Sequence, residues 1–165
     1  MEMEREELGR YALAVLRIGM GWMLIWSFID KIFGLGFQTP SGGGWIDGVS
    51  PSSYVAWIAK GPLADFFVSL GGNVFVDVLM MAGLFCIGMT LIFGFASKIC
   101  TVANIAFLLV MFSIELPPSD NPILNYKILL AIASPAIYYL GGFEKLSIYS
   151  WYKELAIVKR FPILE

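Results

Sequence analysis

Histidine is absent from this chain of 165 residues, and cysteine occurs only at Cys86 and Cys100. The sequence therefore excludes histidine-ligated haem, a histidine-based zinc site and an iron–sulfur cluster held by several cysteines, and no metal is expected. Charge is also scarce, since charged residues make up 15% of the sequence against about 25% in typical soluble domains. A net charge of −2 offers no basic surface for nucleic acid, so no such partner is expected.

The two cysteines are not expected to form a disulfide. Cys86 falls inside one apolar stretch, and Cys100 begins the next one. At about 1.5 Å per helical residue, their depths differ by roughly 8 Å, whereas the Cα atoms of a disulfide lie within about 7 Å of each other. We interpret both as small buried hydrophobic residues.

Apolar residues are abundant: they make up 58% of the sequence, and the mean hydropathy is +0.76. They gather in four stretches, approximately 11–33, 74–95, 99–114 and 126–141. A hydrocarbon core about 30 Å thick needs roughly 20 helical residues, with about 17 enough for a short span. The first two stretches exceed this length, and the other two are near the minimum. The sequence predicts an all-α integral membrane protein, a four-transmembrane-helix bundle within a single domain.

Most Lys and Arg residues flank one side of the predicted bundle. Four spans place both termini on that side, together with Arg5, Arg10, Lys98, Lys145, Lys153, Lys159 and Arg160. Because basic flanks favour the cytoplasm, we expect both termini there and a multi-pass protein of the plasma membrane. The first seven residues lack the basic region and cleavage site of a signal peptide, so the first span should remain in the mature protein. The tail 143–165 is predicted to be cytoplasmic and to carry a surface helix.

The first external connection, 34–73, is too long for a plain turn and is expected to carry structure of its own. Ser50-Pro51 is typical of a helix start. Gly61-Pro62 ends that short helix, and a second one follows over 63–70. Aromatic residues such as Trp45 suit the headgroup region of a membrane. An interfacial anchor and a lid over a ligand site both remain open.

Ionisable residues at membrane depth mark the candidate site, because each is costly in lipid unless it is paired or faces a cavity. Five of them reach one external layer from all four predicted spans: Asp30, Lys31, Asp77, Glu115 and Lys127. We expect them to form the mouth of a polar pocket, with Asp77 paired to Lys31 or Lys127. For Asp30 and Glu115 we favour ordinary helix-end charges that reach the headgroups.

Arg17 lies apart from this layer, about 10 Å further in than Arg10 on the cytoplasmic half. Its expected neighbours, Thr90, Asn104 and Tyr138, are all neutral. It could extend to the interface, brace the bundle through buried hydrogen bonds or bind a polar headgroup. The sequence leaves structural and functional roles equally open.

Several segments carry a family resemblance: 16–22, 30–37, the glycine-rich stretch with Trp45, the pattern Gly88, Leu91, Gly94 and Ser97-Lys98, the turn 117–122 with Asn121, and Tyr126-Lys127. Together they resemble the DoxX/DoxD family of membrane proteins over about 11–142, and they are closer to DoxD. DoxD is the membrane subunit of a thiosulfate:quinone oxidoreductase and works with a second subunit, DoxA.

The resemblance implies that the chain passes electrons from thiosulfate to a membrane quinone. The quinone would be the electron acceptor itself, and the expected partners are the lipid bilayer and a separate DoxA-like subunit, with a homo-oligomer left open. The candidate catalytic residues are Asp77 and Lys31. The candidate substrate-binding residues are Lys31, Lys127, Arg17, Asp30, Trp45 and Asn121. Many DoxX relatives carry a glutamate in the second span where this chain has Asp77.

Two other functions remain open. Members of the broad DoxX superfamily look like non-catalytic partners that assemble or scaffold membrane complexes, and a fold does not fix a function. A small-molecule or ion carrier is the weakest hypothesis, because four short spans without a broken-helix pair or an inverted repeat do not match secondary transporters.

Overall fold

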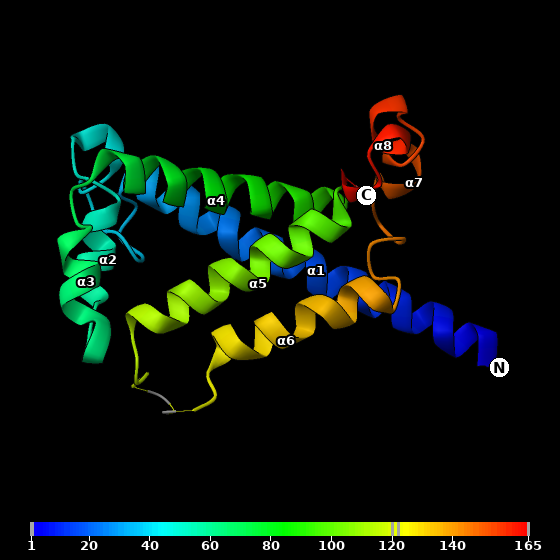
Figure 1. Cartoon of the computed structure of the whole chain (residues 1–165), viewed down its shortest axis with the longest axis horizontal. Helices are drawn as coiled ribbons and strands as arrows, with labels where there is room; N and C mark the ends of the chain where they lie inside the picture. Colours follow the sequence, from blue (N-terminus) through cyan, green and yellow to red (C-terminus); the bar gives the residue numbers. More distant parts are fainter. Residues whose placement is uncertain (1, 120, 122, 165) are drawn as a thin grey trace.

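The computed structural model describes residues 2–119, 121 and 123–164, which form α-helices and 3-10 helices joined by turns (Figure 1). The four long helices are α1 (Glu2–Phe33), α4 (Val74–Phe93), α5 (Ser97–Ile114) and α6 (Tyr126–Tyr139). Within these described residues no β-strand forms, and Lys60 and Glu115 make an isolated parallel bridge. The predicted all-α class is confirmed.

Three of the helices are long and apolar enough to cross a membrane: those over Met3–Phe33, Val74–Phe93 and Ser97–Ile114. Helix α6 has 14 residues, or about 21 Å at 1.5 Å per residue, which is shorter than a core of about 30 Å. Pro135 lies inside α6 and lacks the N–H that would continue the hydrogen-bond ladder. These three helices support the predicted membrane character, and the fourth span stays a prediction.

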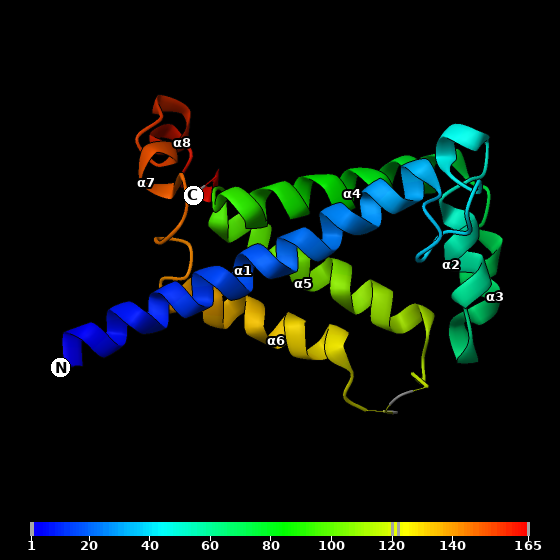
Figure 2. The same cartoon turned by 180° about the vertical axis from the view of Figure 1, so that it is seen from behind.

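The long helices pack as two close pairs, α1 with α4 and α5 with α6. Helices α4 and α5 meet at a tight turn after Phe93 and diverge away from it (Figures 1 and 2). Both chain ends lie at the same end of the bundle, and the segment carrying α2 and α3 lies at the opposite end (Figure 1). This arrangement suits the predicted topology, while the compartment that each end faces stays a prediction.

Helix α1 begins about nine residues earlier than the predicted first span. The added turns are rich in glutamate, which forms helix readily, and they extend beyond the bundle (Figure 2). Two ion pairs join this end to the segment after α6: Lys145 Nζ lies 2.8 Å from Glu7, and Arg10 lies 2.9 Å from Glu144.

The first connection folds into η1 (Trp45–Asp47), α2 (Ser52–Ile58), η2 (Gly61–Leu63) and α3 (Ala64–Ser69). Both predicted short helices are confirmed, and the Gly61-Pro62 break lies where it was expected. Gly61 has a φ of +77°, and a Cβ there would overlap the carbonyl oxygen of Leu116. The neighbouring Lys60 N–H donates to the Ile114 carbonyl over 3.0 Å. This close backbone approach fixes the first connection onto the end of α5.

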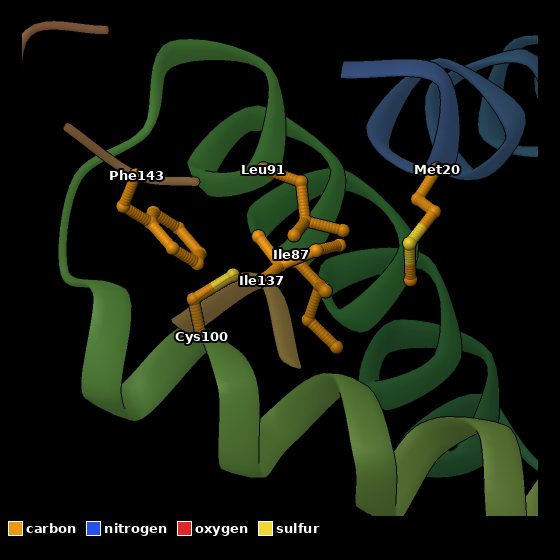
Figure 3. Close-up of a cluster of buried hydrophobic side chains, with 6 residues drawn as sticks. All are labelled: Met20, Ile87, Leu91, Cys100, Ile137 and Phe143. Carbon is orange, nitrogen blue, oxygen red and sulfur yellow. The ribbon is translucent and has the colours of Figure 1, made fainter. Parts of the chain in front are cut away.

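Two apolar clusters fill the bundle. One lies toward the chain ends and joins Met20, Ile87, Leu91, Cys100, Ile137 and Phe143 (Figure 3). The other lies beneath α2 and α3 and joins Val55, Phe67, Met80, Met81, Leu84 and Ile114. Burying these side chains stabilises the bundle and holds the first connection against it.

Both cysteines are free thiols. The prediction that they are buried is confirmed for Cys100 and wrong for Cys86, which α4 turns to the outside of the bundle. Cys100 instead accepts a hydrogen bond from Thr90 Oγ1 over 3.0 Å.

The tail forms α7 (Tyr149–Tyr152), α8 (Ala156–Arg160) and η3 (Pro162–Leu164) in place of one surface helix. The extended backbone of Leu155 separates α7 from α8. The Ile148 N–H donates to the last residue of α4, Phe93, over 2.9 Å, and the ring of Tyr152 lies 5.5 Å from that of Phe95. The tail is therefore attached to the end of α4.

Candidate functional site

A cavity of about 100 Å³, here named the chamber, lies among α1, α2, α4, α5 and α6. Its apolar lining includes four of the eight methionines of the chain, Met20, Met23, Met80 and Met111, together with Leu24 and Phe107. Its polar lining includes Ser27, Lys31, Gln38, Tyr54, Asn104, Glu115, Tyr126 and Lys127. An apolar space with a few convergent polar groups has the composition of a small-molecule site.

Lys31 is a buried charge in the wall of the chamber. The residue is only 4% exposed, and its Nζ donates to Gln38 Oε1 over 3.2 Å and to Ser27 Oγ over 3.3 Å. Nζ also lies 4.0 Å from the centre of the Tyr54 ring, which is within reach of a cation–π interaction. Each of these partners is neutral, and the counter-charge that Lys31 feels is the carboxylate of the adjacent Asp30.

Lys127 pairs with Glu115, whose Oε1 lies 2.7 Å from Nζ, and the two side chains are 8% and 25% exposed. The pair has no net charge, so Lys127 attracts an anion less than an unpaired lysine would. Asn125 caps the start of α6 by accepting from the N–H of Lys127, which fixes the lysine at the rim of the chamber.

Asp77 does not pair with either lysine, so that prediction is wrong. Its carboxylate accepts hydrogen bonds of 2.7 and 2.8 Å from Ser50 Oγ and one of 2.7 Å from the N–H of Ser52. The start of α2 lies against the start of α4, and these donors reach the carboxylate. Asp77 is buried, does not line the chamber and fixes α2 in place.

Asp30 is fully buried, so its interpretation as a headgroup-facing charge is wrong. Its carboxylate accepts from the N–H groups of Phe37, Gln38 and Thr39 over 3.3, 2.9 and 2.8 Å. These bonds fold the chain back over the end of α1 and bring Gln38 to Lys31. Asp30 therefore positions a chamber residue and does not line the chamber itself.

Arg17 lies at the other end of the bundle and is fully buried. Its guanidinium donates to the backbone carbonyls of Leu91, Ile92, Gly142, Lys145 and Leu146. Arginine has five N–H donors, and each of them is used. Two acceptors lie in the last turn of α4, whose carbonyls lack partners within the helix. Of the roles that the sequence left open for Arg17, these bonds support bracing, and its predicted substrate binding stays a prediction.

Trp45 and Asn121 also lie outside the chamber. Trp45 is partly exposed in η1, and Asn121 Oδ1 accepts from the N–H groups of Ile123 and Leu124 in a local turn. Of the residues predicted to bind substrate, Lys31 and Lys127 line the chamber.

Sequence reasoning did not assign Gln38, Tyr54 or Asn104 to the site. Gln38 sits in an irregular glycine-rich segment, where no periodicity marks it. Asn104 carried a signal, because a polar residue inside an apolar span is costly unless it is satisfied. It is buried and donates to Ser134 Oγ over 2.9 Å, which links α5 to α6.

No family model, curated protein or solved structure matched this chain when its sequence and fold were compared with known proteins. The resemblance to the DoxX/DoxD family stays a prediction that rests on the segments quoted above. The functional argument below therefore starts from the chamber.

Proposed function

We propose that the protein is the membrane subunit of a quinone-linked oxidoreductase and that the chamber binds the quinone ring. The observation that carries the proposal is that one cavity combines a buried ammonium with neutral hydrogen-bond partners, a phenol, a carboxylate and a methionine-rich apolar wall. A quinone ring needs apolar contact on its faces and hydrogen-bond donors at its carbonyl oxygens. Thiosulfate as the electron donor, with a DoxA-like partner subunit, follows from the resemblance alone and belongs to the proposal on that basis.

The volume of the chamber limits what it holds. An apolar cavity of about 150 Å³ accommodates benzene, so the chamber of about 100 Å³ must widen to admit a quinone ring, and the flexible methionine side chains of its wall allow this. It excludes a long side chain. Met23 on α1 and Tyr126 on α6 line the chamber, and each is 51% exposed. An isoprenoid tail would therefore leave the chamber between α1 and α6 and enter the surrounding lipid.

Three groups would act on the bound ring. The Lys31 ammonium donates to a carbonyl oxygen and stabilises negative charge there, which a low-dielectric site strengthens. Burial and the nearby Glu115 carboxylate raise the pKa of the Tyr54 phenol, so Tyr54 stays protonated and remains a donor. In the Glu115–Lys127 pair, Nζ lies 2.7 Å from Oε1, and this pair would pass protons to the reduced ring as a relay. A quinone supplies the capacity to accept two electrons and two protons.

The proposal also includes α6 as a fourth span and a cytoplasmic position for both termini. Helix α6 packs along α5, and the apolar residues Ile123, Leu124 and Leu140 flank it, which supports its role as the fourth span. The basic residues at the end of the bundle that holds both termini favour the cytoplasmic side of a plasma membrane for that end. The first connection is then external.

Quinone content and quinone binding test the proposal directly. Purified protein should retain quinone in its lipid extract, detected by mass spectrometry, and should bind a short-chain quinone analogue with quenching of tryptophan fluorescence. Lys31→Met should abolish this binding, because it removes the donor at the ring. Lys60→Met is the matched control, since Lys60 lies at the same end of the bundle but does not line the chamber. Absence of quinone from the extract together with failure to bind the analogue would refute the assignment.

A non-catalytic partner that assembles a membrane complex is the second candidate. It is favoured by the first turns of α1, where Glu4, Glu6, Glu7 and Leu8 are exposed and extend beyond the bundle (Figure 2). This function predicts that a stable complex co-purifies with the Lys31→Met variant and is lost on Glu6→Lys. The oxidoreductase function predicts that Lys31→Met abolishes quinone binding and that Glu6→Lys leaves it unchanged.

A further inference from the structure

A second cavity, of about 370 Å³ and here named the vestibule, lies within the first connection next to the chamber. Its lining comes from the segments 37–40 and 49–57, with Gly43 and Lys31. Lys31, Gln38 and Tyr54 line both cavities. Two lining residues, Val49 and Trp57, are exposed on the outer surface of the connection. The vestibule therefore lies between the loop surface and the chamber.

Polar side chains in the wall of the vestibule favour its hydration. Lys31, Gln38 and Tyr54 line it together with the hydroxyl-bearing Ser50 and Ser53. A cavity of about 370 Å³ has room for water molecules of about 30 Å³ each, and these side chains provide the polar partners that buried water needs.

The partition between the two cavities consists of side chains. Lys31 Nζ sits over the Tyr54 ring at 4.0 Å and bonds to Gln38, while Ser27 Oγ donates to Gln38 Oε1 over 2.9 Å. The backbone on either side is fixed by the buried carboxylates of Asp30 and Asp77. Lys31, Gln38 and Tyr54 line both cavities, so rotation of these three side chains would join the cavities without a movement of the backbone.

We propose that the vestibule is a hydrated entrance through which water and small polar solutes reach the chamber from the loop side, with Lys31, Gln38 and Tyr54 as its gate. The lateral opening at Met23 and Tyr126 faces the lipid, so the chamber has one lipid route and one aqueous route. The aqueous route exists whichever ligand the chamber takes, and it goes beyond the proposed binding of quinone.

Cysteine accessibility tests the entrance. In a Cys86→Ser background, which removes the exposed thiol, single cysteines are placed at Ser53 in the vestibule, at Leu108 in the chamber and at Leu109 outside it. Leu109 is the matched control, because it adjoins Leu108 on α5 but faces outward. A charged, membrane-impermeant methanethiosulfonate added from the loop side should label Ser53→Cys and Leu108→Cys and spare Leu109→Cys. Equal labelling of the two α5 variants, or no labelling of Leu108→Cys, would overturn the proposal.

Two further variants test the route. Ser53→Trp fills the vestibule from an exposed position and should slow labelling of Leu108→Cys about tenfold, which corresponds to about 1.4 kcal/mol of barrier. Tyr54→Ala removes part of the partition and should accelerate the same reaction. Unchanged rates in both variants would refute the gate. Labelling is measured without quinone, so a labelled chamber that binds no quinone refutes only the oxidoreductase function, and an unlabelled chamber that binds quinone refutes only the entrance.

Discussion

Replacing Arg17 by methionine should destabilise the bundle severely, because five backbone carbonyls lose their donor at once. At about 0.6 kcal/mol per hydrogen bond, the average in membrane helices, five bonds contribute about 3 kcal/mol. Hydrogen bonds to a charged group contribute about 1.5 kcal/mol or more each in soluble proteins, so 3 kcal/mol is the lower bound. We expect the midpoint of thermal unfolding to fall by about 6–12 °C or more, at about 2–4 °C per kcal/mol.

Thermal unfolding in detergent, followed by tryptophan fluorescence, measures this loss. Arg10→Met is the matched control: Arg10 lies two helical turns earlier on α1, its side chain is 45% exposed, and it pairs with one carboxylate. Exposed pairs contribute less than about 1 kcal/mol, so this variant should unfold close to the wild-type temperature. Arg17→Lys should be intermediate, because lysine has three N–H donors. An Arg17→Met variant with unchanged thermal stability and abolished ligand binding would refute the bracing role.

Three more predictions concern the connections and the tail. Asp77→Asn should lower the free energy of unfolding by about 1–2 kcal/mol, because hydrogen bonds to a charged carboxylate become hydrogen bonds to a neutral amide. It should also increase proteolysis within the first connection. Gly61→Ala should lower the unfolding temperature more than Gly72→Ala, since both have positive φ but only Gly61 has backbone in the way of a Cβ. The hydrogen bond from Lys159 lowers the pKa of Glu154 below 4.5, so the tail contact persists above that pH and weakens as the pH falls through the lowered value. The protection of tail amides from hydrogen exchange, taken relative to their intrinsic exchange rate at each pH, should fall in this pH range in the wild type. In Glu154→Gln this protection should not change with pH.

Local signals account for what the sequence predicted well. The first residue of α4 and the last of α5 coincide with the predicted spans, since hydropathy ends where a helix leaves the apolar layer. The short helices α2 and α3 follow from their flanking glycine and proline residues, which act within a few positions. The sequence did not predict the early start of α1, because the charged residues before position 11 limit the apolar span but still form helix.

The partners of the buried charges could not be predicted, because they depend on the path of the chain. Asp77 bonds to Ser50, 27 positions earlier, and Arg17 bonds to Gly142, 125 positions later. The prediction matched ionisable residues by their depth in the membrane, so it looked for partners of opposite charge. The hydrogen-bond partners of Asp77 and Arg17 are instead backbone and hydroxyl groups, which every loop can provide. Gln38 reaches Lys31 only after Asp30 has folded the intervening segment.

The buried charges of the bundle therefore separate by partner. Arg17, Asp30 and Asp77 hold backbone segments in place, and Lys127 is neutralised by Glu115. Lys31 is different, because its ammonium contacts two neutral polar groups and an aromatic ring, and its counter-charge, Asp30, is held by three backbone N–H groups. A buried charge is costly unless it is paired and hydrogen-bonded, and an electron-rich oxygen of a ligand would give the Lys31 ammonium a further acceptor. This is why the proposed chemistry rests on Lys31, and why replacing Asp77 should affect the loop before it affects any reaction.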